Sequence, residues 1–427
     1  MNEAIFIARQ DTLEQEILPA HWLAQYKLFG EESYTFQDKE IWKKLCMSSA
    51  AANDRDMHAE ALEEMLTTFS AEHTGKWMLT VYGMDAAVLE GLATMAAIAA
   101  NGTAMGAVVD NALLMHAIAN SETAMQRIAN SQTAMQRVAN NRGAMDAIGR
   151  SRIARDAVQA SPYYNSCIKE NDMAIAKLAV ALANLESAGY SGMAGVAADS
   201  TAMTAVAASA TAMTAVAASS VARNAISASP YYDEKIKEND MAIAKLVVGF
   251  ANLESARYSG CAGMAADSTA MTAVAASSTA MTAVAASGVA LKAIAQAYKK
   301  TANMLQFLKA VNASDTLIKR IYNTLTNATA LFGTAQLGAQ DGVADANSWA
   351  TTSAAPNAFL ACACGYYNSG GASVDVTYNG TAIAQNKTGA KQPNSVTSTN
   401  VNAITMAPST FTENGDGWLA VQKFTAK

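Results

Sequence analysis

Residues 121–140 read SETAMQRIAN SQTAMQRVAN, two stretches of ten residues that differ at only two positions. The same pattern extends in both directions, because methionine recurs at every tenth position from Met95 to Met145. A β-branched aliphatic residue stands three positions after each methionine, and Ser or Asn opens most units. Repetition at a fixed period is the signature of a repeat architecture, here one that spans residues 91–298.

Each unit of ten residues, or decad, is expected to form its own short helix. The Ala-Met pair and the aliphatic residue that follows share one helical face. In a continuous α-helix, however, ten residues turn by about 1000°, which moves that face about 80° out of register at every repeat. A long helix or coiled coil is therefore disfavoured. Because Ser and Asn are preferred N-caps, the pattern predicts helices of about two turns, stacked into an α-solenoid with methionine in its core.

A longer repetition overlies the decads. Residues 161–228 are copied at 229–296, with 53 of 68 positions identical, which implies a recent duplication. Both copies open with Ser-Pro-Tyr-Tyr, beginning at Ser161 and Ser229. This tetrapeptide predicts a helix with Ser as its cap and Pro at its first position.

The two ends differ in composition from the repeat. Residues 1–90 carry three of the five tryptophans and are expected to form a mostly helical head. Residues 299–332 are expected to form a helical cap over the exposed end of the solenoid. Residues 333–427 are rich in Gly, Ser, Thr and Asn, and Asn-Gly steps at 379–380 and 414–415 predict hairpin turns. The strand-like runs are residues 358–367, 373–380, 403–408 and 417–424. The expected fold is mainly α, with a small C-terminal β-sandwich.

Composition argues against several classes of protein. The net charge is −6, and no basic block suggests nucleic-acid binding. The start, MNEAIFIARQDTLEQ, lacks the pattern of a secretory signal, and no apolar run is long enough to insert in a membrane. The five cysteines show no framework spacing, which fits a reducing compartment. Cys362 and Cys364 are interpreted as small buried apolar residues, because no further metal ligands lie nearby in the sequence.

Catalytic motifs are not found in the sequence. Three of the four histidines, His21, His58 and His73, lie in residues 1–90, but no H-E-x-x-H motif accompanies them. A nucleophile elbow, a phosphate loop and a dinucleotide fingerprint are also missing. We therefore expect a protein that is not an enzyme, with no catalytic residues, no metal site and no cofactor. An enzyme within residues 1–90 remains a competing hypothesis.

The decads SETAMQRIAN, SQTAMQRVAN and STAMTAVAAS resemble low-complexity Ala-Met repeats in tail-fibre and other appendage proteins of tailed bacteriophages. The resemblance covers residues 91–300, although no triple-β-helix or collagen-like segment accompanies it. A Ser/Thr/Asn-rich β domain after a repeat also looks like a phage adhesin or fibre tip. The resemblance implies a structural virion component that is assembled in the host cytoplasm, attaches to other virion proteins through its N-terminal head, and forms a homo-oligomer.

The resemblance also implies that the C-terminal domain binds a host-surface glycan or protein. Tyr366, Tyr367, Tyr378 and Trp418 are the candidate contact residues, because aromatic faces suit sugars. Burial in the sandwich core is the competing interpretation, and it is favoured for Trp418. A non-viral α-solenoid scaffold or adhesin that binds protein partners is the alternative function. Such a scaffold would carry varied polar residues at a fixed decad position, whereas positions six and seven are mostly small or Gln-Arg.

Overall fold

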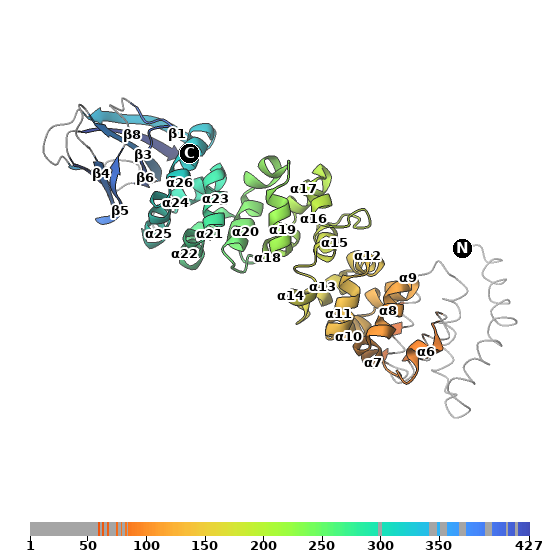
Figure 1. The fold of residues 1–427 in the computed structure, drawn as a ribbon. Helices are drawn as coiled ribbons and strands as arrows, with labels where there is room; N and C mark the ends of the chain where they lie inside the picture. Colours follow the sequence, from red (N-terminus) through yellow and green to blue (C-terminus); the bar gives the residue numbers. More distant parts are fainter. Residues whose placement is uncertain are drawn as a thin grey trace, which may run out of the picture. The chain divides into compact units, whose positions relative to one another are not determined.

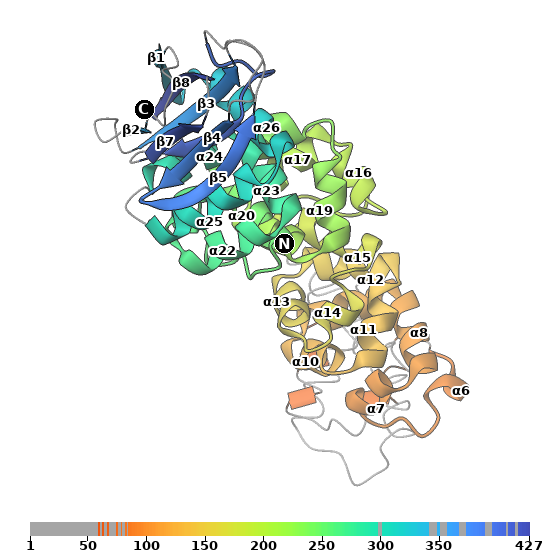
Figure 2. The same ribbon diagram turned by 60° about the vertical axis from the view of Figure 1, so that its left-hand side comes forward.

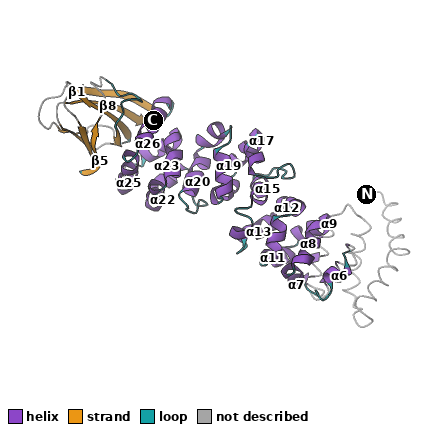
Figure 3. Ribbon diagram, in the orientation of Figure 1, coloured by secondary structure: helices purple, strands orange, loops and turns teal. Residues whose placement is uncertain are grey.

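The computed structural model describes residues 84–297 without a gap and most of the chain after residue 300. Helices fill the described chain as far as Asn327, and antiparallel strands follow (Figures 1 and 3). The fold is therefore mainly α with a C-terminal β region, as predicted at that level. The other described residues are nine single positions between Ala59 and Tyr82, and 301–427 except for 341–347, 351–356, 367–372, 389–394, 407–408 and 415–416.

The chain divides into two compact units, Met1–Val196 and Ala197–Lys427, and the division falls within the predicted repeat. Most of the predicted head at 1–90 lies outside the described residues. In the first unit the helices are α6 (Ala86–Leu89), α7 (Met95–Ala100), α8 (Gly102–Asp110), α9 (Ala112–Asn120), α10 (Glu122–Ala129), α11 (Gln132–Ala139), α12 (Arg142–Arg150), α13 (Arg152–Ala160), α14 (Tyr164–Cys167), α15 (Asp172–Leu182) and α16 (Met193–Ala197), the last of which crosses the division.

Single residues join successive helices, as the decad pattern predicts. The backbone N–H of Ser121 donates to the carbonyl of Ile118 and so ends α9. The hydroxyl of Ser121 then accepts the N–H of Ala124 at 3.1 Å, which caps the start of α10. Asn111 joins α8 to α9 in the same way, and the two helices bend by 100° there. The predicted Ser and Asn N-caps are thus confirmed.

In the first unit, each decad helix packs against the third helix after it. The pairs are α7 with α10, α8 with α11, α9 with α12, α10 with α13, and α12 with α15. Serine hydroxyls join these pairs: Ser131 Oγ donates to the carbonyl of Ala99 at 2.6 Å, and Ser151 Oγ to that of Ala119 at 2.5 Å. Because each hydroxyl also caps its own helix, one serine satisfies backbone groups at two helix ends.

The methionines form the centre of this packing. Met95, Met105, Met115, Met125, Met135 and Met145 are each at most 1% exposed. The aliphatic residues three positions later, such as Ile128 and Val138, are fully buried beside them. The packing role predicted for the methionine row is therefore confirmed.

The second unit repeats the same packing between third neighbours. The pairs are α17 with η5, α20 with α23, α21 with α24, α22 with α25, and α23 with α26. Its helices are α17 (Ser200–Ala208), α18 (Ala210–Ala218), α19 (Ser220–Ser227), the π-helix η5 (Asp233–Lys237), α20 (Asp240–Phe250), α21 (Cys261–Ala266), α22 (Ser268–Ala276), α23 (Ser278–Ala286), α24 (Gly288–Gln296), α25 (Thr301–Asn312) and α26 (Asp315–Asn327).

Each copy of the duplication therefore contributes six helices, α14–α19 or η5–α24. The helix start predicted at Ser-Pro-Tyr-Tyr is wrong by a few residues, because α14 begins at Tyr164 and η5 at Asp233. Ser161 instead holds a turn: its hydroxyl accepts the N–H of Tyr163 and donates to the carbonyl of Ala129, three helices earlier.

Glycine allows the closest helix crossings. In α20, a methyl group placed on Gly249 would lie 2.3 Å from the backbone carbonyl oxygen of Ala217 in α18. Residues 68 positions earlier have the two small side chains exchanged, with Gly149 in α12 and Ala181 in α15. There, a methyl group on Gly149 would lie 3.2 Å from the Ala181 Cβ. Each crossing thus holds one Gly and one Ala.

The strands form two four-stranded antiparallel sheets in the orders β1-β8-β3-β6 and β2-β7-β4-β5 (Figure 2). Asn379 and Gly380 have φ of 47° and 75° and join β4 to β5, so this predicted hairpin is confirmed. The hairpin predicted at Asn414-Gly415 is wrong, because β7 and β8 belong to different sheets. The strands are β1 (Phe332–Gln340), β2 (Ser348–Ala350), β3 (Ala358–Tyr366), β4 (Ser373–Tyr378), β5 (Thr381–Thr388), β6 (Ala403–Met406), β7 (Ser409–Asn414) and β8 (Gly417–Ala426).

Helices α25 and α26 hold the strands to the repeat. The Asn312 carboxamide donates to the carbonyl of Ile404 in β6 at 2.7 Å and accepts the N–H of the same residue at 3.1 Å. The Tyr322 hydroxyl contacts the carbonyl of Val396 at 2.6 Å, and its ring packs edge-on against Phe424. One apolar core therefore continues from the last decads into both sheets.

Candidate functional site

The four aromatic residues proposed from the sequence do not form one described cluster. Tyr366 ends β3 opposite Gly417, and Trp418 lies on the neighbouring strand β8 opposite Gly365. The side chains of Tyr366 and Trp418, and the whole of Tyr367, lie outside the described residues. Tyr378 ends β4 in the other sheet, and its side chain is 1% exposed. It therefore belongs to the core, as the competing interpretation proposed, and not to an exposed contact surface.

The two cysteines of the C-x-C pair are buried in the same strand. Cys362 and Cys364 both lie in β3 and are fully buried among apolar side chains. This confirms their interpretation as small core residues. Within the described part of the chain, no three side chains of His, Cys, Asp or Glu are grouped so that they could hold a metal ion.

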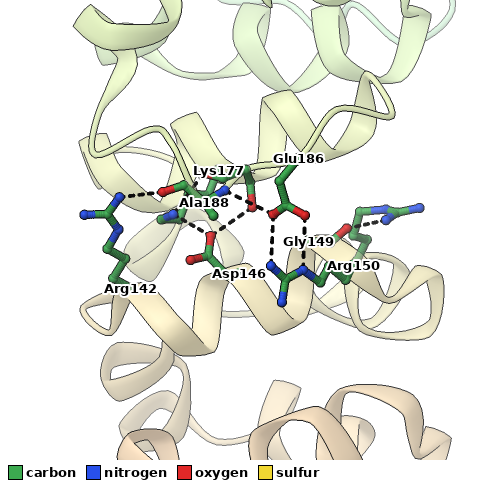
Figure 4. Close-up of polar contacts among 9 residues, drawn as sticks. Arg142, Asp146, Gly149, Arg150, Lys177, Glu186 and Ala188 are labelled. Carbon is green, nitrogen blue, oxygen red and sulfur yellow. Dashed lines mark hydrogen bonds and ion pairs between the residues drawn. The ribbon is translucent and has the colours of Figure 1, made fainter. Parts of the chain in front are cut away.

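A polar group buried between α12 and α15 was missed by sequence reasoning. Lys177 is fully buried, and its Nζ lies 2.5 Å from Asp146 Oδ1 (Figure 4). The same ammonium donates to the carbonyl of Ser187 at 3.0 Å. The Ser187 hydroxyl donates to Asp146 Oδ1, also at 3.0 Å. The sequence signal was a lysine within the apolar run MAIAKLAVA, which we had interpreted only as an interruption.

Two arginines of α12 extend this group at the surface (Figure 4). Arg142 donates to the carbonyl of Ala188, and Arg150 donates to both carboxylate oxygens of Glu186, at 3.2 and 3.3 Å. The hydrogen bond from Arg150 is the main cause that lowers the pKa of Glu186. Both partners are about half exposed, so this pair adds little stability. Its effect is to hold the segment after α15 against α12.

The second copy contains a matching lysine without the aspartate. Lys245, in α20, is 2% exposed, and its Nζ donates to Thr214 Oγ1 at 3.0 Å and to the carbonyls of Ser255 and Ala256 at 2.9 and 3.2 Å. Thr214 stands 68 residues after Asp146 and takes its place. The duplication thus offers two versions of one buried site, one with a carboxylate partner and one with a hydroxyl.

This difference predicts a pH dependence for the second site. Burial lowers the pKa of Lys245 in the folded chain. The unfolded chain, in which the pKa is about 10.4, therefore binds this proton more tightly. Stability contributed by this residue then rises with pH between the lowered pKa and about pH 10.4. We expect the free energy of unfolding of the wild type, relative to that of Lys245→Met, to increase from pH 7 to pH 10 in urea titrations.

The control for this prediction supplies the missing carboxylate. Thr214→Asp recreates the partner that Lys177 has in the first copy, and the aspartate favours the charged form of Lys245. We expect this variant to shift the rise in stability to higher pH. Equal pH profiles for the wild type and Lys245→Met would contradict the prediction.

Two surface cavities occur in the described residues, one in each unit. The first measures about 530 Å³ and lies between α10 and α13; it contains Ile153, which is 40% exposed. It is lined by Glu122, Gln126, Ala129, Asn130, Ile153, Asp156, Ala157, Ala160 and Ser161. The second measures about 430 Å³ and is lined by Lys237, Ala286, Thr316, Lys319, Arg320, Asn323, Thr324 and Asn327. The first pairs apolar residues with carboxylates, whereas the second is basic.

No protein-family model matches the chain, and a search of curated proteins finds no similar sequence. Within the described residues, no single helix is long and apolar enough to cross a membrane. Three pairs of consecutive helices reach the required length and apolar composition only together, and each pair is bent by 100° or 104°. Function must therefore be argued from the packing, the polar sites and the decads themselves.

Proposed function

We propose that this chain is a structural component of a tailed-phage virion, a tail fibre or a similar appendage. In this proposal the decad helices form an α-solenoid that acts as a spacer, and the two C-terminal sheets form a β-sandwich that binds a partner. The observation that carries the proposal is the packing of third neighbours, which recurs in both units with methionine at its centre.

The physical argument is that the repeated residues are used for packing. Helices of nine residues are marginal in water, so each decad depends on its neighbours for stability. The methionine, the aliphatic residue and the capping serine of a decad are all engaged in helix-to-helix contacts. A repeat of this kind adds length with each unit and leaves few side chains for chemistry. This favours a spacer over an enzyme.

The two ends would then provide the contacts. Residues 1–90 attach the chain to other virion proteins, and residues 333–427 face a host-surface glycan or protein. Several copies of the chain assemble in the host cytoplasm and become part of the particle. The shared core of α25, α26 and the sheets supports this arrangement, because it fixes the binding end to the spacer.

The test locates the chain in particles. A peptide tag fused after Lys427 should be detected by gold-labelled antibody at the free end of an appendage, and mass spectrometry should find the chain in purified particles. Excess purified chain should also compete with particles for adsorption to host cells. A chain that is missing from purified particles would refute the virion proposal, and adsorption that excess chain does not change would refute the binding role.

A further inference from the structure

The basic cavity of the second unit is built from one exposed face of α26 and the end of η5. Lys319, Arg320 and Asn323 are exposed on α26, and Lys237 of η5 lines the same cavity. Residues three and four apart on a helix lie on one face, which explains why these α26 side chains line the cavity together. The cavity therefore concentrates three cationic groups within about 430 Å³.

Carboxylates close in sequence to this cavity are engaged elsewhere. Asp315 is bound to Lys387 at 3.3 Å rather than to Lys319, one helical turn away. Glu238 accepts the backbone N–H groups of Gly288 and Val289 at the start of α24. Two further pairs are Asp233 with Lys237 at 3.5 Å and Glu234 with Lys235 at 2.7 Å. Among the described residues, Lys319 and Arg320 form no ion pair, and no carboxylate lines the cavity.

The remaining lining residues are hydrogen-bonding groups. Asn323 and Asn327 present carboxamides, which can both donate to and accept from hydroxyl groups. Thr316 adds a hydroxyl, whereas the Thr324 hydroxyl already donates to the carbonyl of Ala285 at 2.7 Å. Cations next to carboxamides match a ligand that has one anionic group and several hydroxyls.

We propose that this cavity binds an acidic saccharide, a sugar that carries a carboxylate or a phosphate. The anionic group lies between Lys319 and Arg320, where the arginine fork can make two parallel hydrogen bonds, and the ring hydroxyls face Asn323 and Asn327. This inference rests on the proposed function and specifies the host-surface ligand as an acidic glycan. Because the cations are exposed, binding weakens as the salt concentration rises.

The test uses the full chain and defined sugars. Glucuronate and glucose 6-phosphate provide the carboxylate and phosphate forms, and glucose is the neutral control. We expect both acidic sugars, or one of them, to bind in calorimetry or ligand-observed NMR, and glucose to show no binding. Lys319→Gln combined with Arg320→Gln should weaken binding at least tenfold. Lys309→Gln, which removes an exposed cation of α25 outside the cavity, should leave it unchanged.

The outcomes separate this proposal from the proposed function. Equal binding of glucose and the acidic sugars, or binding that the double variant does not change, would overturn the acidic-saccharide site. No binding of either acidic sugar would overturn it too, even where the chain is found in particles. Acidic-sugar binding by a chain that is missing from particles would support the site and overturn the virion proposal. Circular dichroism of both variants checks that the helices stay intact.

Discussion

Replacing Asp146 with alanine is expected to lower the free energy of unfolding of the N-terminal unit by about 3–5 kcal/mol. The reason is that Lys177 is fully buried and would lose its carboxylate partner, 2.5 Å away. The carbonyl of Ser187 would remain as an acceptor, but it cannot neutralise an ammonium group. Urea unfolding measures the loss, and hydrogen exchange should show it first in α12 and α15.

The second copy provides the matched control. Thr214→Ala removes the corresponding partner of Lys245, but two carbonyl acceptors and no charge partner are involved there. A loss of about 1 kcal/mol is therefore expected, typical of one hydrogen bond. The double variant Asp146→Ala with Lys177→Met should recover much of the stability, because no buried charge remains. If Asp146→Ala cost no more than Thr214→Ala, the ion pair would not be the source of stability.

Gly249→Ala is expected to destabilise the C-terminal unit by about 1–3 kcal/mol, the usual range for overpacking. Alanine is the better helix former by about 1 kcal/mol, so intrinsic propensity alone predicts the opposite sign. The clash decides the result, because the added methyl group would lie 2.3 Å from the carbonyl oxygen of Ala217 and a backbone atom cannot rotate away. Urea unfolding of the full chain provides the measurement.

The first copy shows how this clash can be relieved. There the glycine is Gly149 and its partner is Ala181, the reverse of the pair in the second copy. The exchanged variant Ala217→Gly with Gly249→Ala reproduces that arrangement and should recover most of the stability that Gly249→Ala loses. A double-mutant cycle gives the coupling energy between the two positions. Purely additive effects would mean that the crossing does not require one Gly and one Ala.

Local structure in the repeat could be predicted from the sequence because each decad carries its own signals. The Ser or Asn cap, the apolar face and the period of ten residues all act within one helix, and the structure has helices bounded at those caps. Strands β3, β4, β6 and β8 were also indicated by local apolar runs. Strands β1, β5 and β7 were not predicted, because sequences such as TAIAQNKT and STFTEN carry weak apolar signals.

Contacts between distant decads could not be predicted from the same signals. Nothing within one decad specifies that its partner is the third helix along the chain, because that choice depends on the 100° bend at each joint. Lys177 and Asp146 are 31 residues apart, so their pairing is visible only once the packing is known. Glu63 likewise binds the Ser121 hydroxyl and the Thr123 backbone from 58 and 60 residues away.

The candidate site followed the same division. Tyr378 was selected for its side-chain chemistry, but alternation along β4 directs it into the core. Burial of alternate residues in a strand depends on which face is covered, and that face was unknown from the sequence. The basic cavity was missed because Lys237 and Arg320 lie 83 positions apart and belong to different elements.

The grouping of helices in threes has a consequence for how this gene can change. The duplicated segment encodes six helices, a whole multiple of three, so inserting it preserves which kind of helix meets which. Nearly identical neighbouring copies also promote unequal recombination, which would add or remove the same segment again. Descendants of this sequence should therefore differ in length by steps of 68 residues, and steps of a single decad should be selected against.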